Sequence, residues 1–145
     1  MNNVSAERGR WAHYPHDADI GIRGCGHTLG EAFANAARAM SAAVTPLDAI
    51  AARDTVSVTC RSPDIDILFV DWLNAVIYEM ATRGMLFRDF DVSIDAGALH
   101  AEMTGEPIDV PRHAPAVEPK GATLTDLSVT RTPDGLWTAQ CVVDV

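Results

Sequence analysis

The feature that most constrains the fold is a long, strongly apolar segment between residues 64 and 84. Its apolar side chains recur at three- and four-residue spacing, which is the period of an α-helix. Ser62 and Pro63 are typical of a helix start, with Ser62 as N-cap, and Gly84 is typical of a helix end. Because its apolar stripe is wide, this helix must be largely buried and the rest of the chain must pack around it. The stripe consists of Ile65, Leu68, Phe69, Trp72, Leu73, Val76, Ile77 and Met80, widened by Ile67 and Val70.

A second amphipathic helix is predicted from Leu29 to Val44. Thr28 and Glu31 fit a capping box, in which Thr28 is the N-cap and Glu31 reaches back to the first turn. The helix is expected to end before Pro46, which cannot continue it.

The remaining apolar residues alternate with polar ones, which is the pattern of half-buried strands. A proline-rich loop is expected from Pro107 to Pro119. The resulting order, β-β-α-β-α-β-β-β-β, predicts an α+β two-layer sandwich, in which a mixed or antiparallel sheet packs with two main helices. The predicted strands cover residues 11–14, 19–23, 55–60, 90–94, 99–103, 122–129 and 136–143.

With 145 residues, of which 48% are hydrophobic, the chain is expected to form one domain, 1–145, with a flexible stretch at 1–9. No signal peptide or membrane-length apolar run is recognisable, and the three cysteines show no zinc spacing. Three buried, reduced thiols and a cytoplasmic location are therefore expected. The net charge of −9 disfavours strong nucleic-acid binding and suits a divalent cation or a basic protein partner, or serves solubility alone.

Two aspartates stand out as candidate metal ligands. Asp19 follows His16 and Asp17 and begins an apolar strand, and Asp144 ends an apolar strand, VVDV, next to Val145. If the first and last strands are neighbours, both carboxylates and an oxygen of Val145 could hold Ca²⁺, Mg²⁺ or Mn²⁺. The alternative is that Asp19 caps a turn and Asp144 is a solvated strand end.

Lys120 and Asp71 also allow two interpretations each. Lys120, between the proline-rich loop and a strand, is either a functional cation or an ordinary surface lysine. Asp71 interrupts the apolar helix and is interpreted as a buried hydrogen-bond anchor rather than as a functional group.

The motifs taken together resemble the archease family. The resemblance covers nearly the whole chain in one order: the HxAD element at His16–Asp19, the helix entry 20–40, "LFVDWLNAVIY" at 68–78, and the segment 84–92. It continues through 99–113, which contains the GEP.D..RH pattern, the lysine strand 119–129, and the ending 137–145.

The resemblance implies a non-catalytic activator of an RtcB-type RNA ligase, which joins 3′-phosphate or 2′,3′-cyclic phosphate RNA ends to 5′-hydroxyl ends in tRNA splicing or RNA repair. The activator promotes the GTP-dependent guanylylation and the turnover of the ligase. The family's essential positions map to Asp19, Lys120 and Asp144. The two aspartates, with Val145, are implied to hold a divalent cation such as calcium.

Five positions depart from the family pattern. Asp17 replaces a threonine, which adds a carboxylate, and Pro119 and Gly121 flank Lys120 where valine and alanine are usual. The usual YHDL is Leu124-Thr125-Asp126-Leu127 here, so Leu124 and Thr125 replace a tyrosine and a histidine. These differences affect the details of the partner surface.

Two other functions remain open from the residues alone. A metal-dependent phosphohydrolase or nuclease would use Asp19 and Asp144 as ligands and His16 as general base. A chaperone-like interaction module would rest on the acidic surface.

Overall fold

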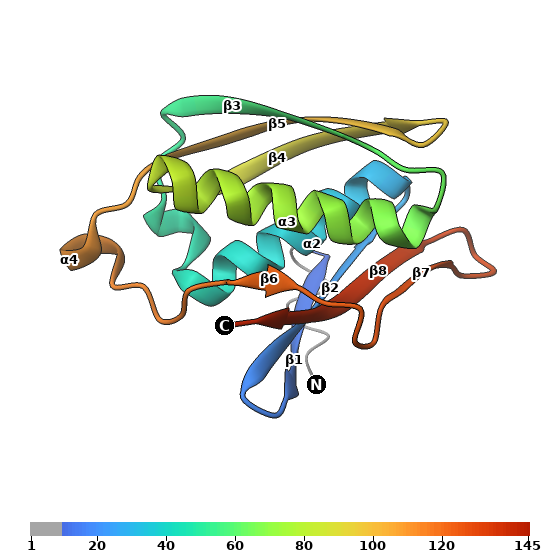
Figure 1. The fold of residues 1–145 in the computed structure, drawn as a ribbon, viewed down its shortest axis with the longest axis horizontal. Coiled ribbons are helices and arrows are strands. Elements are labelled where there is room, and N and C mark those ends of the chain that lie inside the picture. Colours follow the sequence, from blue (N-terminus) through green and yellow to red (C-terminus); the bar gives the residue numbers. More distant parts are fainter. Residues whose placement is uncertain (1–9) are drawn as a thin grey trace.

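The computed structural model describes residues 10–145, so the expectation for residues 1–9 lies outside the described residues. In Figure 1 the elements follow the sequence from blue to red. Their bounds are β1 (Trp11–His16), β2 (Asp19–Gly26), α2 (Leu29–Val44), the 3₁₀ turn η1 (Leu47–Ala49), β3 (Asp54–Arg61), α3 (Ile65–Arg83), β4 (Met85–Asp95), β5 (Ala98–Pro107), α4 (Val110–His113), β6 (Gly121–Ala122), β7 (Ser128–Arg131) and β8 (Trp137–Asp144).

The strands form two antiparallel sheets. The first has the order β1-β2-β8-β6, with β7 also paired to β8, and the second has the order β3-β5-β4. All pairings are antiparallel. The α+β class predicted from the sequence is therefore confirmed, although the strands divide between two sheets.

The two long helices lie between these sheets, as Figure 1 shows. Helix α2 contacts β1, β2 and β8 on one side and β4 on the other, and α3 contacts β3, β4, β6 and β7. Trp72 and Phe33 are fully buried, and the Trp72 indole donates to the Phe33 carbonyl at 2.9 Å. The apolar surface of α3 is thus covered from several sides, as its sequence requires.

The helix ends follow the local signals closely. The Thr28 hydroxyl accepts from the Glu31 amide, and Glu31 accepts from the His27 amide, so the predicted capping arrangement forms with a shift of one residue. Gly84 ends α3 with a left-handed φ of 62°. The predicted N-cap of α3, Ser62, was wrong: Asp64 caps the helix and accepts from the Asp66 and Ile67 amides.

Two expectations for the C-terminal half are corrected. The strand predicted over 122–129 is two short strands, β6 and β7, because a turn at residues 124–126 interrupts it, although Thr123 and Thr125 still hydrogen-bond to Val142 of β8. The loop predicted over 107–119 contains the single turn α4, which begins at the Asp109 N-cap.

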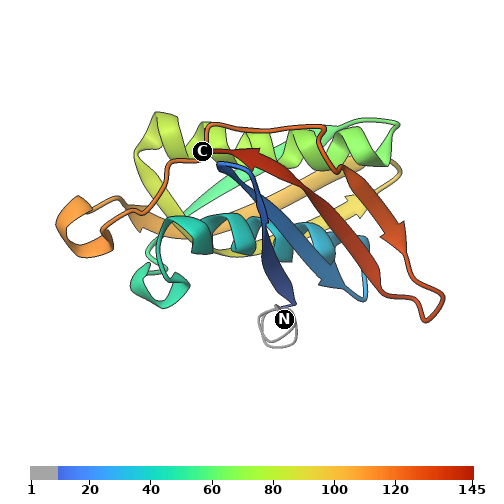
Figure 2. The same cartoon turned by 90° about the horizontal axis from the view of Figure 1, so that it is seen from below.

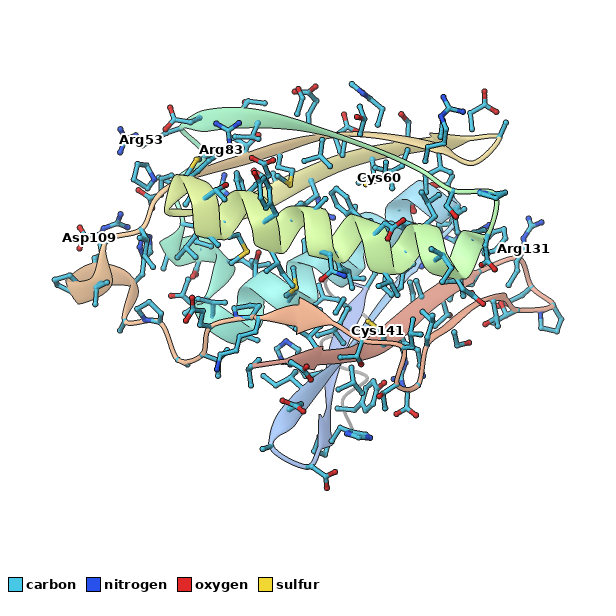
Figure 3. All side chains as sticks on the ribbon, viewed as in Figure 1. Arg53, Cys60, Arg83, Asp109, Arg131 and Cys141 are labelled. Atoms are coloured by element: carbon cyan, nitrogen blue, oxygen red, sulfur yellow. The ribbon has the colours of Figure 1, made fainter. Side chains whose placement is uncertain are left out.

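The cysteines form no disulfide, but only Cys141 is buried, whereas Cys25 and Cys60 are partly exposed. Cys60 and Cys141 lie on different sheets (Figure 3). Asp71 is exposed, so its interpretation as a buried anchor was wrong. Within residues 10–145, no helix is long and apolar enough to cross a membrane.

Candidate functional site: two opposed aspartates at the end of a sheet

Asp19 is placed by a tight hairpin between β1 and β2. His16 pairs with Asp19, so Asp17 and Ala18 form the two-residue turn. Asp17 has a left-handed φ of 53°, a conformation that aspartate tolerates better than the β-branched threonine of the family pattern. Its side chain is 95% exposed and lies 4.0 Å from the His16 ring, so Asp17 projects from the tip of the hairpin.

Asp144 lies directly across from Asp19 on the neighbouring strand. Strand β2 pairs with β8 from Gly26↔Trp137 to Ile20↔Val143, and the next step in this register brings Asp19 opposite Asp144. The Val145 amide donates to Asp19 Oδ1 at 3.2 Å, which fixes the two strand ends together. Because opposed residues of an antiparallel pair share one face, both carboxylates lie on the same face of the sheet.

Lys120 reaches the same place from the other side of β8. Its amide donates to the Asp144 carbonyl at 2.8 Å, and Gly121 pairs with Asp144. Figure 2 shows the chain end, the β1–β2 turn and the segment leading into β6 side by side. The structure therefore places Asp19, Asp144, Val145 and the Lys120 backbone at one end of this sheet, with His16 opposite Asp19.

The departures beside Lys120 are compatible with this arrangement. Pro119 lacks an amide hydrogen, but the bond to β8 comes from Lys120 itself. A Cβ on Gly121 would meet only the Asn74 Oδ1 at 3.8 Å, so the alanine usual in the family would also fit. Pro119 is buried while Lys120 is exposed, which directs the lysine toward solvent.

The electrostatics of the carboxylate pair, Asp19 and Asp144, are unusual. Like charges that face each other across adjacent strands repel. Within residues 10–145, neither aspartate forms an ion pair with Lys, Arg or His. Arg23, also on β2, is engaged elsewhere, since it donates to Gln140 at 2.9 Å and lies over the Tyr14 ring. The pair therefore has the charge to bind a cation.

The ligand set fits one hard cation only in part. Among the described residues, no three His, Cys, Asp or Glu side chains are grouped closely enough to hold a metal ion. The available oxygens are those of the two aspartates together with a carbonyl or terminal oxygen of Val145. Calcium takes six to eight oxygens and magnesium six, so most positions would be filled by water or by a partner.

The sequence reasoning missed an ionic cluster formed by the buried Glu106 and His113 and the half-exposed Arg112. Glu106 is 2% exposed, and its carboxylate accepts from Arg112 at 2.8 Å, from His113 Nε2 at 3.0 Å and from the Ala51 amide at 2.7 Å. These bonds, that with Arg112 foremost, lower the pKa of Glu106 to about 2. The GEP.D..RH pattern contains all three residues, so their spacing was the available signal.

Asn74 was also missed. Its side-chain oxygen accepts from the Ala122 amide at 2.9 Å and ties β6 to helix α3. Nothing in the helical pattern distinguishes Asn74 from any exposed polar residue, because its partner lies 48 residues away.

The family model of the Archease protein family matches residues 11–145. The chain belongs to the archease family. The protein archease of Pyrococcus abyssi is 35% identical over 140 residues, covering 94% of this chain and 99% of the relative. The protein archease of Methanosarcina barkeri is 31% identical over 147 residues, covering 98% of this chain and all of the relative.

Two solved structures share the fold. The solution structure of Methanobacterium thermoautotrophicum protein 1598 has a TM-score of 0.82 and 30% identity, and covers 94% of this chain and 99% of that one. The crystal structure of an archease from Thermotoga maritima, described as a possible chaperone, has a TM-score of 0.62 and 18% identity. It covers 91% of this chain and 94% of that one. The archease membership expected from the motifs is thus confirmed.

Proposed function

We propose that this archease-family protein is a non-catalytic activator of an RtcB-type RNA ligase and acts in the cytoplasm in tRNA splicing or RNA repair. In this role it promotes guanylylation of the ligase and its multiple turnover. The observation that carries the proposal is the convergence of Asp19, Asp144 and Lys120 at one end of a sheet. These are the three positions that the archease resemblance marks as essential.

The carboxylate pair would hold a divalent cation. Asp19 and Asp144 would contribute side-chain oxygens, and Val145 would contribute a main-chain or terminal oxygen. A hard divalent cation bound there would neutralise the opposed charges and attract further oxygen ligands. Because the protein supplies few ligands, the cation would remain open to water and to groups of the ligase.

Lys120 would meet the partner directly. Its side chain is exposed and forms no ion pair among residues 10–145, while its amide is fixed to β8. A flexible ammonium on a fixed backbone can contact a phosphate or carboxylate of the ligase. Asp17 and His16, at the hairpin tip, lie beside this surface and would form its rim.

The test is ligase guanylylation and multiple-turnover RNA joining, with and without the protein. We expect stimulation by the wild type and loss of stimulation, on the order of tenfold or more, in Asp19→Ala, Asp144→Ala and Lys120→Ala, as metal-site and contact residues typically give. Asp91→Ala on strand β4 and Arg61→Ala on β3 are matched controls, because both residues are exposed and lie on the other sheet.

Three outcomes would contradict the proposal. If the wild type leaves a cognate ligase unchanged, the activator function is wrong. Cation-dependent cleavage of RNA by the protein alone, lost in Asp144→Ala, would instead indicate a hydrolase. Suppression of client aggregation that is indifferent to Asp144→Ala would indicate a chaperone-like module.

A further inference from the structure

We propose that the cluster of buried Glu106 and His113 with the half-exposed Arg112 is a positioning device for Lys120, acting through the strap, residues 114–120, that joins α4 to β6. This inference rests on the proposed function, because it assigns a role to residues that act through Lys120. In Figure 1 the strap runs from α4 to the start of β6, and Figure 3 labels Asp109 where the chain enters α4.

The cluster fastens the start of the strap to three other segments. Glu106 belongs to the end of β5 and binds the Ala51 amide, while Arg112 donates both to Glu106 and to the Ala49 carbonyl at 2.9 Å. One buried carboxylate therefore joins β5, the turn at 49–51 and helix α4.

His113 has a defined tautomer that fits this role. The Asp109 amide donates to His113 Nδ1 at 2.9 Å, so Nδ1 is unprotonated and Nε2 carries the hydrogen that faces Glu106. The His113 carbonyl accepts from the buried Thr45 hydroxyl at 2.8 Å, which ties the end of α4 to the end of α2. Both the ring and the carbonyl of His113 thus help to fix the start of the strap.

The strap itself has few attachments. Its Ala116 amide donates to the Val44 carbonyl at 2.9 Å, and its Lys120 amide donates to Asp144 at 2.8 Å. Val117 packs against Val44, Ile50 and Leu86. Pro115 and Pro119 restrict the backbone in between.

A pocket that opens to solvent borders the strap. Its volume is about 340 Å³, and its lining includes Ile77, Met80 and Leu86 together with Val117 and Pro119 of the strap. Where a segment is closely packed, the neighbouring side chains fix its path. The strap borders an open pocket, so part of its surface has no such neighbours among the described residues. The path of the strap, and with it the position of Lys120, therefore depends on how its ends are held.

The first test measures how firmly the strap is held in the free protein. Hydrogen exchange of the Ala116 and Lys120 amides is compared in the wild type, Arg112→Ala and Glu106→Gln. Arg112 is 48% exposed, so its replacement should leave the fold intact even if Glu106→Gln does not. We expect exchange at both amides to be faster on the order of tenfold. Glu102→Gln, an exposed-side-chain change on the same strand, is the matched control and should leave both rates unchanged.

The second test measures ligase stimulation. Arg112→Ala should lower stimulation on the order of tenfold, Arg112→Lys should restore part of it, and Arg112→Ala should have no further effect when Lys120 is already alanine. A merely structural role would lower stimulation by the same factor in both backgrounds.

Unchanged exchange at Lys120 in Arg112→Ala, or losses that multiply in the double variant, would overturn the positioning role. If the wild type fails to stimulate the ligase, the proposed function fails, and the exchange rates still decide whether the cluster holds Lys120 in place.

Discussion

Two groups of carboxylates in this molecule have opposite surroundings. Glu106 is buried and receives hydrogen bonds from Arg112, His113 and the Ala51 amide. Asp19 and Asp144 lie at the end of a sheet, face each other, and pair with no basic side chain within residues 10–145.

The two groups differ in whether a charged partner within the protein compensates the carboxylate. A buried carboxylate with all its partners present is part of the architecture, because leaving any partner unpaired would be costly. Opposed carboxylates without a cation leave a repulsion that a bound ion would relieve. Stability and cation binding should therefore respond to different substitutions in the two groups.

The largest effect on stability is expected from Glu106→Gln. The amide cannot accept from Arg112 and His113 as the carboxylate does, so the buried His113 and the half-exposed Arg112 both lose their charged partner. The melting temperature should fall further than in Glu102→Gln, with or without calcium. A melting temperature equal to that of the wild type would contradict the structural assignment of this cluster.

Low pH should reproduce part of the stability loss expected in Glu106→Gln. The hydrogen bonds from Arg112 and Ala51 hold the pKa of Glu106 near 2, below its ordinary value of 4.5. Because the folded-state pKa is depressed, this stabilisation is complete above about 4.5 and is lost as the pH falls toward about 2. Thermal melts across this window should show a steeper loss in the wild type than in Glu106→Gln, and equal slopes would argue against it.

A divalent cation should stabilise the wild type by binding to Asp19 and Asp144. At a concentration about 100 times Kd, binding to the folded state alone adds about 2.7 kcal/mol to the free energy of unfolding. Melts in calcium, magnesium and manganese would rank the ions. The gain should disappear in Asp144→Asn and Asp19→Asn and persist in Asp91→Asn, and persistence in all three would place the cation elsewhere.

The smallest effect on stability is expected for Asp144→Asn in metal-free buffer. Asp144→Asn removes one of two like charges across adjacent strands, so the free energy of unfolding should rise by a few tenths up to about 1 kcal/mol. Added salt should reduce the difference, because it screens exposed charges. A destabilised Asp144→Asn at low salt would mean that the carboxylate has a stabilising role of its own.

The site was predictable to different degrees. The local pattern singled out Asp19 and Asp144 as carboxylates beside apolar strands, but their juxtaposition was conditional on β2 and β8 being neighbours, and that pairing joins residues more than 110 positions apart. Asp71 was misjudged because a charge within an apolar run can still fall on the exposed side of a helix. Glu106 was missed because strand alternation does not distinguish a buried carboxylate from a partly exposed one such as Glu102, and the GEP.D..RH spacing was used only for the family resemblance.

By itself, the sequence determined the local elements and where most of them end. Thr28, Pro46 and Gly84 act on the backbone within one turn, and alternation and helical periodicity need no distant partner. Only the tertiary structure decided that the strands form two sheets with the helices between them, that Asp19 faces Asp144, and that the buried Glu106 meets Arg112 and His113. The physical reason is that strand pairing and burial depend on contacts between segments far apart in the chain, which local patterns do not specify.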